Sequence, residues 1–117
     1  MGRRQPAARK RDGRMVLVPT HRPPVHPGEV LVEEFLKPLG ISQVELAERL
    51  GITFQRVNAI ANERRSVTPD TALRLSKVFG TSPGFWLNLQ QARDLYEAMH
   101  SDAGKDIENL KRIAATA

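Results

Sequence analysis

The fold is decided by residues 41–65, which read ISQVELAERLGITFQRVNAIANERR. Ser42 is suited to cap the start of a first helix, and Glu45, three residues later, completes the pattern of a capping box. Gly51 can adopt the left-handed conformation that ends this helix. The hydroxyl of Thr53 can then cap a second helix. The segment therefore predicts two short helices separated by a turn at Gly51.

Each of these helices has apolar residues at helical spacing. The first helix contributes Val44, Leu46, Ala47 and Leu50, and the second contributes Val57, Ile60 and Ala61. Because each stripe needs a surface to cover it, we expect the two helices to share one core.

The outward face of the second helix is rich in side-chain amides. At about 100° per residue, this face holds Gln55, Asn58, Ala59 and Asn62. Asn and Gln can form paired hydrogen bonds with adenine in the major groove of DNA, and a small Ala can contact a thymine methyl group. The face therefore predicts DNA binding. On the residues alone, the alternative is an ordinary helical hairpin with a hydrated polar face.

The same geometry assigns roles around this face. We expect Thr53, Phe54, Gln55, Asn58 and Ala59 to contact bases, and Arg56, Asn62, Arg64 and Arg65 to contact phosphates. Phe54 has an alternative role, which is to pack on the domain itself.

The chain resembles a known family over about two thirds of its length, from Arg22 to about Tyr96. Three blocks carry the resemblance: RPPVHPGEVLVEEFLKPLGIS, QVELAERLGITFQRVNAIANERR and TPDTALRLSKVFGTSPGFWLNLQ. They resemble the HigA/VapI group of antitoxins, which belongs to the Cro and phage-repressor (xenobiotic response element, XRE) helix-turn-helix family. The chain departs from the family at Ala61 and Glu63, where a Leu and a Gly are usual.

The resemblance implies a repressor that binds its own operator and neutralises a HigB-type toxin, a ribosome-dependent mRNA endonuclease of the RelE fold. It also implies a phosphate contact for Gln43, at the start of the first helix of the pair. Two alternatives stay open. One is an orphan repressor without a toxin, and the other is a toxin-inhibiting protein for which DNA binding is secondary.

Further helices flank this pair, so the predicted fold class is all-α, with five helices and a C-terminal helical extension. Pro27 is suited to start the first helix, and Pro38 to end or distort its last turn. Thr68 caps a later helix that ends at Gly80, and Ser82 caps the next one. The side chains expected inside are Val30, Leu31, Phe35, Leu39, Ala72, Leu73, Leu75, Val78 and Phe79.

The helix after Ser82 has an apolar stripe longer than one small domain needs. Phe85, Trp86 and Leu89 are expected to close the core. The surplus residues Leu95, Tyr96 and Met99 predict a homodimer interface. A two-fold dimer would place two recognition helices about 34–36 Å apart on an inverted repeat. Asp102 is expected to cap a last helix that carries Ile107, Leu110 and Ile113.

Positive charge is concentrated at the N-terminus. Residues 1–22 hold seven Lys and Arg side chains against the single acid Asp12, a net +6, which leaves −1 for residues 23–117 of a chain whose total is +5. We expect residues 1–22 to be a flexible basic tail, residues 23–99 the DNA-binding domain and residues 100–117 the extension. The tail is either an arm that contacts DNA or a source of non-specific affinity only, and translation starting at Met15 would remove most of it.

Several classes of function find no support in the residues. The chain has no cysteine, and its three histidines, His21, His26 and His100, lack the spacing of a metal site. No catalytic motif is present, so we expect no enzyme activity and no cofactor. No apolar stretch approaches the length of a membrane span. We therefore expect a cytoplasmic protein with no membrane partner.

Overall fold

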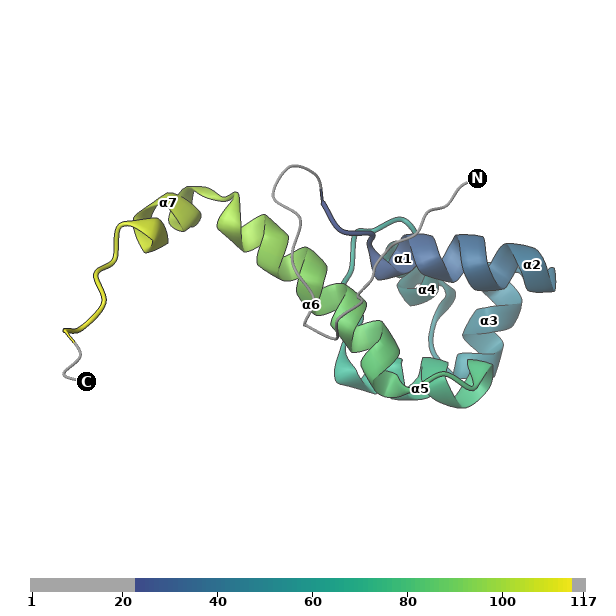
Figure 1. The fold of residues 1–117 in the computed structure, drawn as a ribbon. Coiled ribbons are helices and arrows are strands. Elements are labelled where there is room, and N and C mark those ends of the chain that lie inside the picture. Colours follow the sequence, from purple (N-terminus) through teal and green to yellow (C-terminus); the bar gives the residue numbers. More distant parts are fainter. Residues whose placement is uncertain (1–22, 115–117) are drawn as a thin grey trace.

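The computed structural model describes residues 23–114, and in this range the chain forms six helices and no strand (Figure 1). The first helix is continuous but consists of three labelled parts: α1 (Pro27–Val30), η1 (Leu31–Leu36) and α2 (Lys37–Leu39). It is followed by α3 (Gln43–Leu50), α4 (Phe54–Ala61), α5 (Pro69–Phe79), α6 (Pro83–Met99) and α7 (Asp102–Glu108). The all-α prediction is confirmed.

The helix starts follow the capping residues that the sequence indicates. The hydroxyl oxygens of Ser42, Thr53, Thr68 and Ser82 each accept a hydrogen bond from the backbone N–H three residues later. Glu45 completes no capping box in the structure, because its carboxylate pairs with Arg49 at 3.3 Å. Gly51 and Gly80 end α3 and α5 in the left-handed conformation, with φ of 73° and 78°. The helix-turn-helix boundaries are therefore set by local chemistry.

The first helix is distorted before Pro38 and not at it. The backbone N–H of Lys37 bonds to the carbonyl of Val32, five residues back, and η1 has π-helical geometry. A proline ring clashes with the carbonyl four residues before it, and a wider π turn relieves that clash. Gly40 then ends the helix with φ of 66°.

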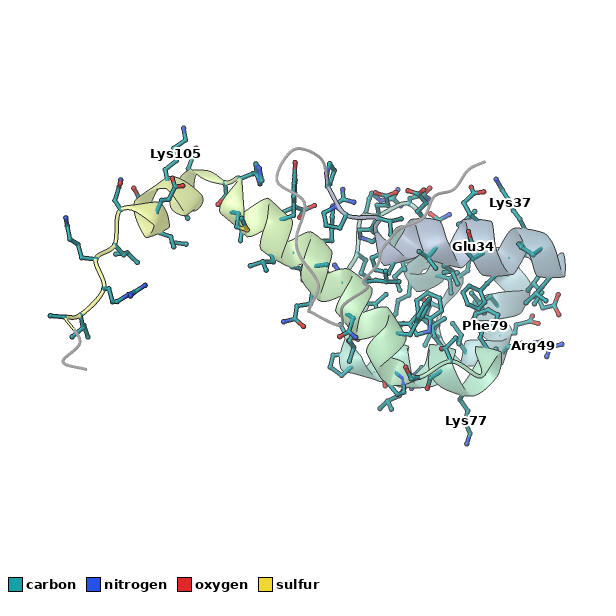
Figure 2. The ribbon with its side chains drawn as sticks, viewed as in Figure 1. Glu34, Lys37, Arg49, Lys77, Phe79 and Lys105 are labelled. Carbon is teal, nitrogen blue, oxygen red and sulfur yellow. The ribbon has the colours of Figure 1, made fainter. Side chains whose placement is uncertain are left out.

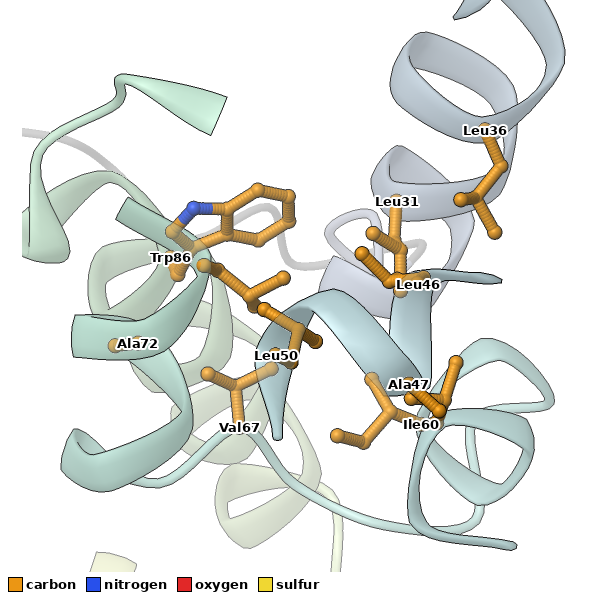
Figure 3. Packing of buried hydrophobic residues seen from close by; sticks show 11 residues of the cluster. Leu31, Leu36, Leu46, Ala47, Leu50, Ile60, Val67, Ala72 and Trp86 are labelled. Carbon is orange, nitrogen blue, oxygen red and sulfur yellow. The ribbon is translucent and has the colours of Figure 1, made fainter. Parts of the chain in front are cut away.

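One apolar core joins the helices (Figure 3). Trp86 is the largest fully buried side chain of this core, and its indole N–H donates to the hydroxyl of Thr81 at 2.7 Å. The ring of Phe35 lies 5.2 Å from that of Trp86, measured between centroids. The buried core residues are Leu31, Leu36, Leu46, Ala47, Leu50, Val57, Ile60, Val67, Ala72, Leu75 and Trp86.

Four residues expected inside are exposed instead. Val44 is 55% exposed, Leu73 59%, Leu39 58% and Phe85 39%. The ring of Phe85 packs edge-on against Trp86, with 5.0 Å between centroids, and its other side lies in solvent. Val44 and Leu73 each lie two residues before a buried leucine, so they point about 160° away from it around the helix. Leu39 lies in α2, at the end of the first helix that extends past the core, and Leu36 takes the buried position.

The N-terminus of α1 lies tightly against the C-terminus of α4. A β-carbon built on Gly28 would lie 1.9 Å from the carbonyl oxygen of Ile60, which is inside van der Waals contact. The backbone N–H of Gly28 donates to Nδ1 of His26 at 2.9 Å, so a buried imidazole caps α1. Only glycine permits this approach of the two helices.

The C-terminal part of α6 leaves the body of the molecule, and α7 lies at its far end (Figure 1). Ser101 caps α7, not Asp102 as expected, because its hydroxyl accepts from the N–H of Gly104 at 3.2 Å. The helix ends at Glu108, before Leu110 and Ile113. Ile107, Leu110 and Ile113 are all exposed, so they form no stripe against the domain. Within residues 23–114, no helix is long and apolar enough to cross a membrane.

The glycine at position 28 provides a direct test of this packing. We expect Gly28→Ala to lower the free energy of unfolding by about 3 kcal/mol or more, because a backbone carbonyl cannot move as a side chain can. Urea denaturation measures the effect.

Gly84→Ala is the matched control. A β-carbon at Gly84 would meet its nearest atoms at 3.9 Å, an ordinary contact. Since alanine is about 1 kcal/mol better than glycine in a helix, this variant should be at least as stable as the parent. Equal effects of the two substitutions would contradict the proposed packing.

Candidate nucleic-acid interface

The position of α4 is fixed by a guanidinium clamp. Arg56 donates to the carboxylate of Asp70 and to the hydroxyl of Thr71, both at 2.9 Å. Arg74 donates to the same carboxylate and, at 2.8 Å, to the carbonyl of Leu50 at the end of α3. Hydrogen bonds from Arg74 and Arg56 lower the pKa of Asp70. Three helices, α3, α4 and α5, are therefore tied together through one exposed carboxylate.

This clamp bears on one of the predicted phosphate contacts. The guanidinium of Arg56 is used inside the protein, and its side chain is only 26% exposed. Sequence spacing gives no sign of the pairing, because Asp70 lies 14 residues away on the next helix. In the structure Arg56 positions α4, and its contact with phosphate stays a prediction.

Three other predicted site residues form one hydrogen-bonded chain. The amide nitrogen of Asn58 donates to the amide oxygen of Gln43 at 3.0 Å. Arg64 donates to the amide oxygen of Asn58 at 3.3 Å. The structure thus brings together residues from α3, α4 and the turn after α4, and it fixes the orientation of the Asn58 amide.

The remaining members of the predicted face differ in exposure. Thr53, Phe54, Gln55, Asn62 and Arg65 are exposed, whereas Ala59 is half-buried. Phe54 is 42% exposed, so its ring is neither packed inside nor fully in solvent. The exposed start of α4 therefore presents the hydroxyl of Thr53, the ring of Phe54 and the amide of Gln55 in consecutive positions.

Elsewhere on the surface, Lys77 points away from α5 while Phe79 points inward (Figure 2).

The turn after α4 keeps a left-handed backbone without glycine. Glu63 has φ of 62°, and it is the sole non-glycine residue with positive φ among those the structure describes. Its N–H bonds to the carbonyl of Ile60, and the N–H of Arg64 bonds to that of Ala59. These two bonds form a Schellman motif, in which glycine is the usual residue at the left-handed position. Glu63 therefore adopts the left-handed conformation of a Schellman turn at a position where the family usually has glycine.

Two residues of α6 contact this turn and the segment after it, and the sequence analysis did not single out either of them. Arg93 lies 3.8 Å from the carboxylate of Glu63, bonds Glu97 at 2.8 Å, and donates to the carbonyl of Pro24 at 3.1 Å. Buried Gln90 accepts from the N–H of Val67 at 2.8 Å. The sequence signal for Gln90 is a polar residue within the apolar stripe of this helix, which is typical of a buried side chain that binds the backbone.

His26 lies in a polar pocket beside the same turn. The pocket has a volume of about 220 Å³ and is lined by His26, Glu63, Arg64, Arg65, Ser66, Gln90, Arg93, Asp94 and Glu97. Burial lowers the pKa of His26, and the charge of Arg93 acts in the same direction against the opposing effect of the carboxylates. The imidazole therefore favours the neutral form, which its acceptor role at Gly28 requires.

The residues predicted to form a dimer interface lie along the outer part of α6. Leu95 and Met99 are each 48% exposed. Tyr96 is partly buried and stacks on His100, with 4.1 Å between ring centroids. Leu95 also lines a groove of about 560 Å³ with Val67, Leu87, Gln90, Gln91 and Asp94. Apolar surface is therefore available at this position, and its role in pairing stays a prediction.

No group of three or more potential ligands in residues 23–114 is arranged to hold a metal ion.

Comparison with known proteins gives consistent matches. The helix-turn-helix family HTH_3 matches residues 32–86. Virulence-associated protein I of Dichelobacter nodosus is 51% identical over 73 residues, which cover 62% of this chain and 68% of that protein. Antitoxin GraA in complex with its operator has a TM-score of 0.75 at 45% identity, covering 86% of this chain and 100% of GraA. Pseudomonas aeruginosa antitoxin HigA with the higBA promoter has a TM-score of 0.73 at 37% identity, covering 77% and 98%.

The left-handed turn yields a stability prediction. We expect Glu63→Gly to raise the free energy of unfolding by about 1 kcal/mol, since a residue with a β-carbon is strained there. The substitution also removes the ion pair with Arg93. Because that pair has an N–O distance of 3.8 Å and is partly exposed, its loss should change the free energy of unfolding little. Glu63→Ala is the control, because it removes the carboxylate and keeps the strain. A glycine variant less stable than the alanine variant would show that the strain is negligible.

The buried imidazole yields a pH prediction. Because the pKa of His26 is lower in the fold than its ordinary value of 6.5, the unfolded chain binds a proton more readily. The contribution of His26 to stability is therefore complete above pH 6.5 and declines as the pH falls below it. Denaturant unfolding between pH 7.5 and 5 measures this decline.

His26→Asn is the control for the pH prediction, since asparagine can cap a helix but does not titrate. Its stability should change less over the same range. Identical pH profiles for the two proteins would rule out His26 as the source.

Proposed function

We propose that this chain, which belongs to the HigA/VapI-type antitoxins of the XRE helix-turn-helix family, represses transcription as a homodimer on an inverted-repeat operator and neutralises a HigB-type toxin. The family consists of DNA-binding regulators and not of enzymes. The observation that carries the proposal is the exposed amide face of α4, held rigidly by α3 and α5.

Two amides on this face have different roles in base recognition. Gln55 is exposed at the start of α4 and can form paired hydrogen bonds with adenine. Asn58 is already held by Gln43 and Arg64, so its amide reaches DNA in one fixed orientation. Gln55 therefore supplies most of the direct discrimination, and Thr53, Phe54 and Ala59 shape the surface around it.

Phosphate contacts would flank the amide face. The amide oxygen of Gln43 accepts from Asn58, which leaves its amide nitrogen to donate to a phosphate. Asn62 and Arg65 are exposed beyond the end of α4, where the duplex backbone would pass. Contacts on both sides of the helix fix its register in the groove, and this supports a specific complex.

Dimerisation would come from the outer part of α6. The exposed side chains of Leu95 and Met99, with the ring of Tyr96 beside them, provide an apolar strip away from α4. Such pairing leaves both recognition helices free to enter successive major grooves, about 34–36 Å apart. Operator binding and dimerisation then use separate surfaces of the same protomer.

The second partner that we propose, beside operator DNA, is a toxin protein. Antitoxin HigA-1 of Vibrio cholerae, a relative named for this role, supports the existence of a toxin for this chain. We expect a small basic protein encoded next to this gene to co-purify with the full chain and to lose its mRNA-cleaving activity in the complex. Co-expression without complex formation would favour the orphan-repressor alternative.

DNA binding is tested by two substitutions with different signatures. Gln55→Ala should cost about 1–3 kcal/mol at particular base pairs of the operator. Arg65→Ala should weaken binding to all sequences and reduce the slope of log K against log salt by about one. Gel shifts on operator and random duplexes over a salt series measure both.

Lys105→Ala provides a matched charge control, since Lys105 lies on α7, far from α4 (Figure 2). It removes one positive charge and should leave the salt slope unchanged. Equal losses on operator and random DNA for Gln55→Ala and Arg65→Ala would show that the base and phosphate roles are wrongly assigned.

A further inference from the structure

The corner between α6 and α7 is built by specific contacts. The hydroxyl of Ser101 donates to the carbonyl of Ala98 at 2.7 Å and accepts from the N–H of Gly104 at 3.2 Å. A β-carbon at Gly104 would lie 2.8 Å from the carbonyl oxygen of Ala98 and closer still to that of Met99. The backbones of the two helices therefore lie close together, and α7 has a defined direction at the far end of α6 (Figure 1).

This corner holds a group of apolar side chains away from the domain core. Ile107 is 58% exposed, Leu110 73% and Ile113 87%. We call residues 107–113 the C-terminal segment. A single exposed apolar side chain is common on protein surfaces, whereas a group of large ones marks a surface that another molecule covers. The C-terminal segment is therefore a candidate contact surface.

A groove along α6 offers an apolar surface of matching kind. It has a volume of about 560 Å³, and its apolar lining comes from Val67, Leu87 and Leu95. Leu95 remains 48% exposed within it. None of residues 102–114 lines this groove, which we call the α6 groove. Because α7 lies beyond the end of α6, the C-terminal segment leaves the groove of its own protomer uncovered (Figure 1).

The two surfaces also carry opposite charge. Residues 109–114 include Lys111 and Arg112 and contain no acid. The lining of the α6 groove includes Asp94 and has no basic residue. One oxygen of Asp94 accepts from Gln90 at 2.9 Å, and the other has no partner among the described residues. A basic side chain next to a docked apolar residue would pair with this oxygen.

We infer that the C-terminal segment of one protomer docks in the α6 groove of a second copy of this chain. This inference rests on the homodimer proposed above, and it names a further part of the interface. Two-fold symmetry would make the contact twice, since each protomer offers one segment and one groove. Leu95 belongs to both the groove and the apolar strip proposed for pairing, so the two contacts form one continuous surface.

Introduced cysteines test the contact directly, because the chain has none of its own. Gln91 lines the groove and Ala114 follows the C-terminal segment, and both are exposed. Full-length Gln91→Cys and Ala114→Cys proteins are mixed under mild oxidation. Docking raises the effective concentration of the two thiols, so the mixture should form a mixed disulfide dimer about tenfold or more faster than either protein alone.

Lys77→Cys is the matched control for the groove position, since Lys77 is exposed and points away from α5 (Figure 2). Its mixture with Ala114→Cys should form no more linked dimer than the single proteins do. A chain that carries both Gln91→Cys and Ala114→Cys should link to a second chain and not within itself.

The affinity of the dimer provides a second measurement. Leu110→Ser combined with Ile113→Ser should raise the dissociation constant of the dimer about tenfold or more, because both side chains lose apolar surface for burial. Both are exposed in the protomer, so the fold should be unaffected. Asn109→Ser is the control and should leave the constant unchanged. Sedimentation equilibrium of the full chain measures all three proteins.

The failures of the inference and of the proposed dimer are distinguishable. A parent chain that sediments as a monomer would overturn the homodimer and the inference together. A stable dimer that forms no mixed disulfide, or that keeps its affinity after both serine substitutions, would overturn the inference alone. A disulfide within the doubly substituted chain would also overturn it, because the segment would then cover its own groove.

Discussion

The contact between Gly28 and the carbonyl of Ile60 is the constraint on which the rest of the structure depends. It brings the start of the first helix onto the end of α4, closer than any residue with a β-carbon would allow. His26 caps the first helix at that point, and Glu63 turns the chain on the other side of the contact. The recognition helix is thus held at its C-terminal end by backbone packing, a restraint that no single side-chain rotamer change removes.

A second restraint on α4 comes from side-chain hydrogen bonds to the neighbouring helices. Arg56 joins it to α5 at Asp70, while Asn58 joins it to α3 at Gln43. With both ends fixed, the exposed residues from Thr53 to Gln55 are presented on a rigid element. Rigidity matters for the base contacts that we propose for these residues, because hydrogen bonds to bases tolerate little displacement. The domain therefore uses much of its polar chemistry to orient a few side chains.

Arg93 connects this recognition unit to the rest of the chain. Its three contacts reach the N-terminal segment at Pro24, the turn at Glu63 and its own helix at Glu97. Since α6 also carries the exposed apolar residues Leu95 and Met99, one helix contacts the turn after α4 and carries the surface that we propose for a second protomer. The segment after α4 is thus joined to α6 at two points, the ion pair of Arg93 with Glu63 and the hydrogen bond from the N–H of Val67 to Gln90.

The sequence by itself determined the starts of α3 and α4 and the ends of α3 and α5, because Ser42, Thr53, Gly51 and Gly80 act on the backbone within three or four residues. It also determined the helical fold and the family, since apolar spacing and motif order are local properties. It placed Val44, Leu73, Leu39 and Phe85 inside wrongly, because an apolar stripe wider than the core does not show which of its residues the core covers. Only the tertiary structure decided that Arg56 clamps α5, that Arg93 supports the turn at Glu63 and that Gly28 meets Ile60. Each of these joins residues far apart in the chain, and their distance in space depends on how whole helices pack.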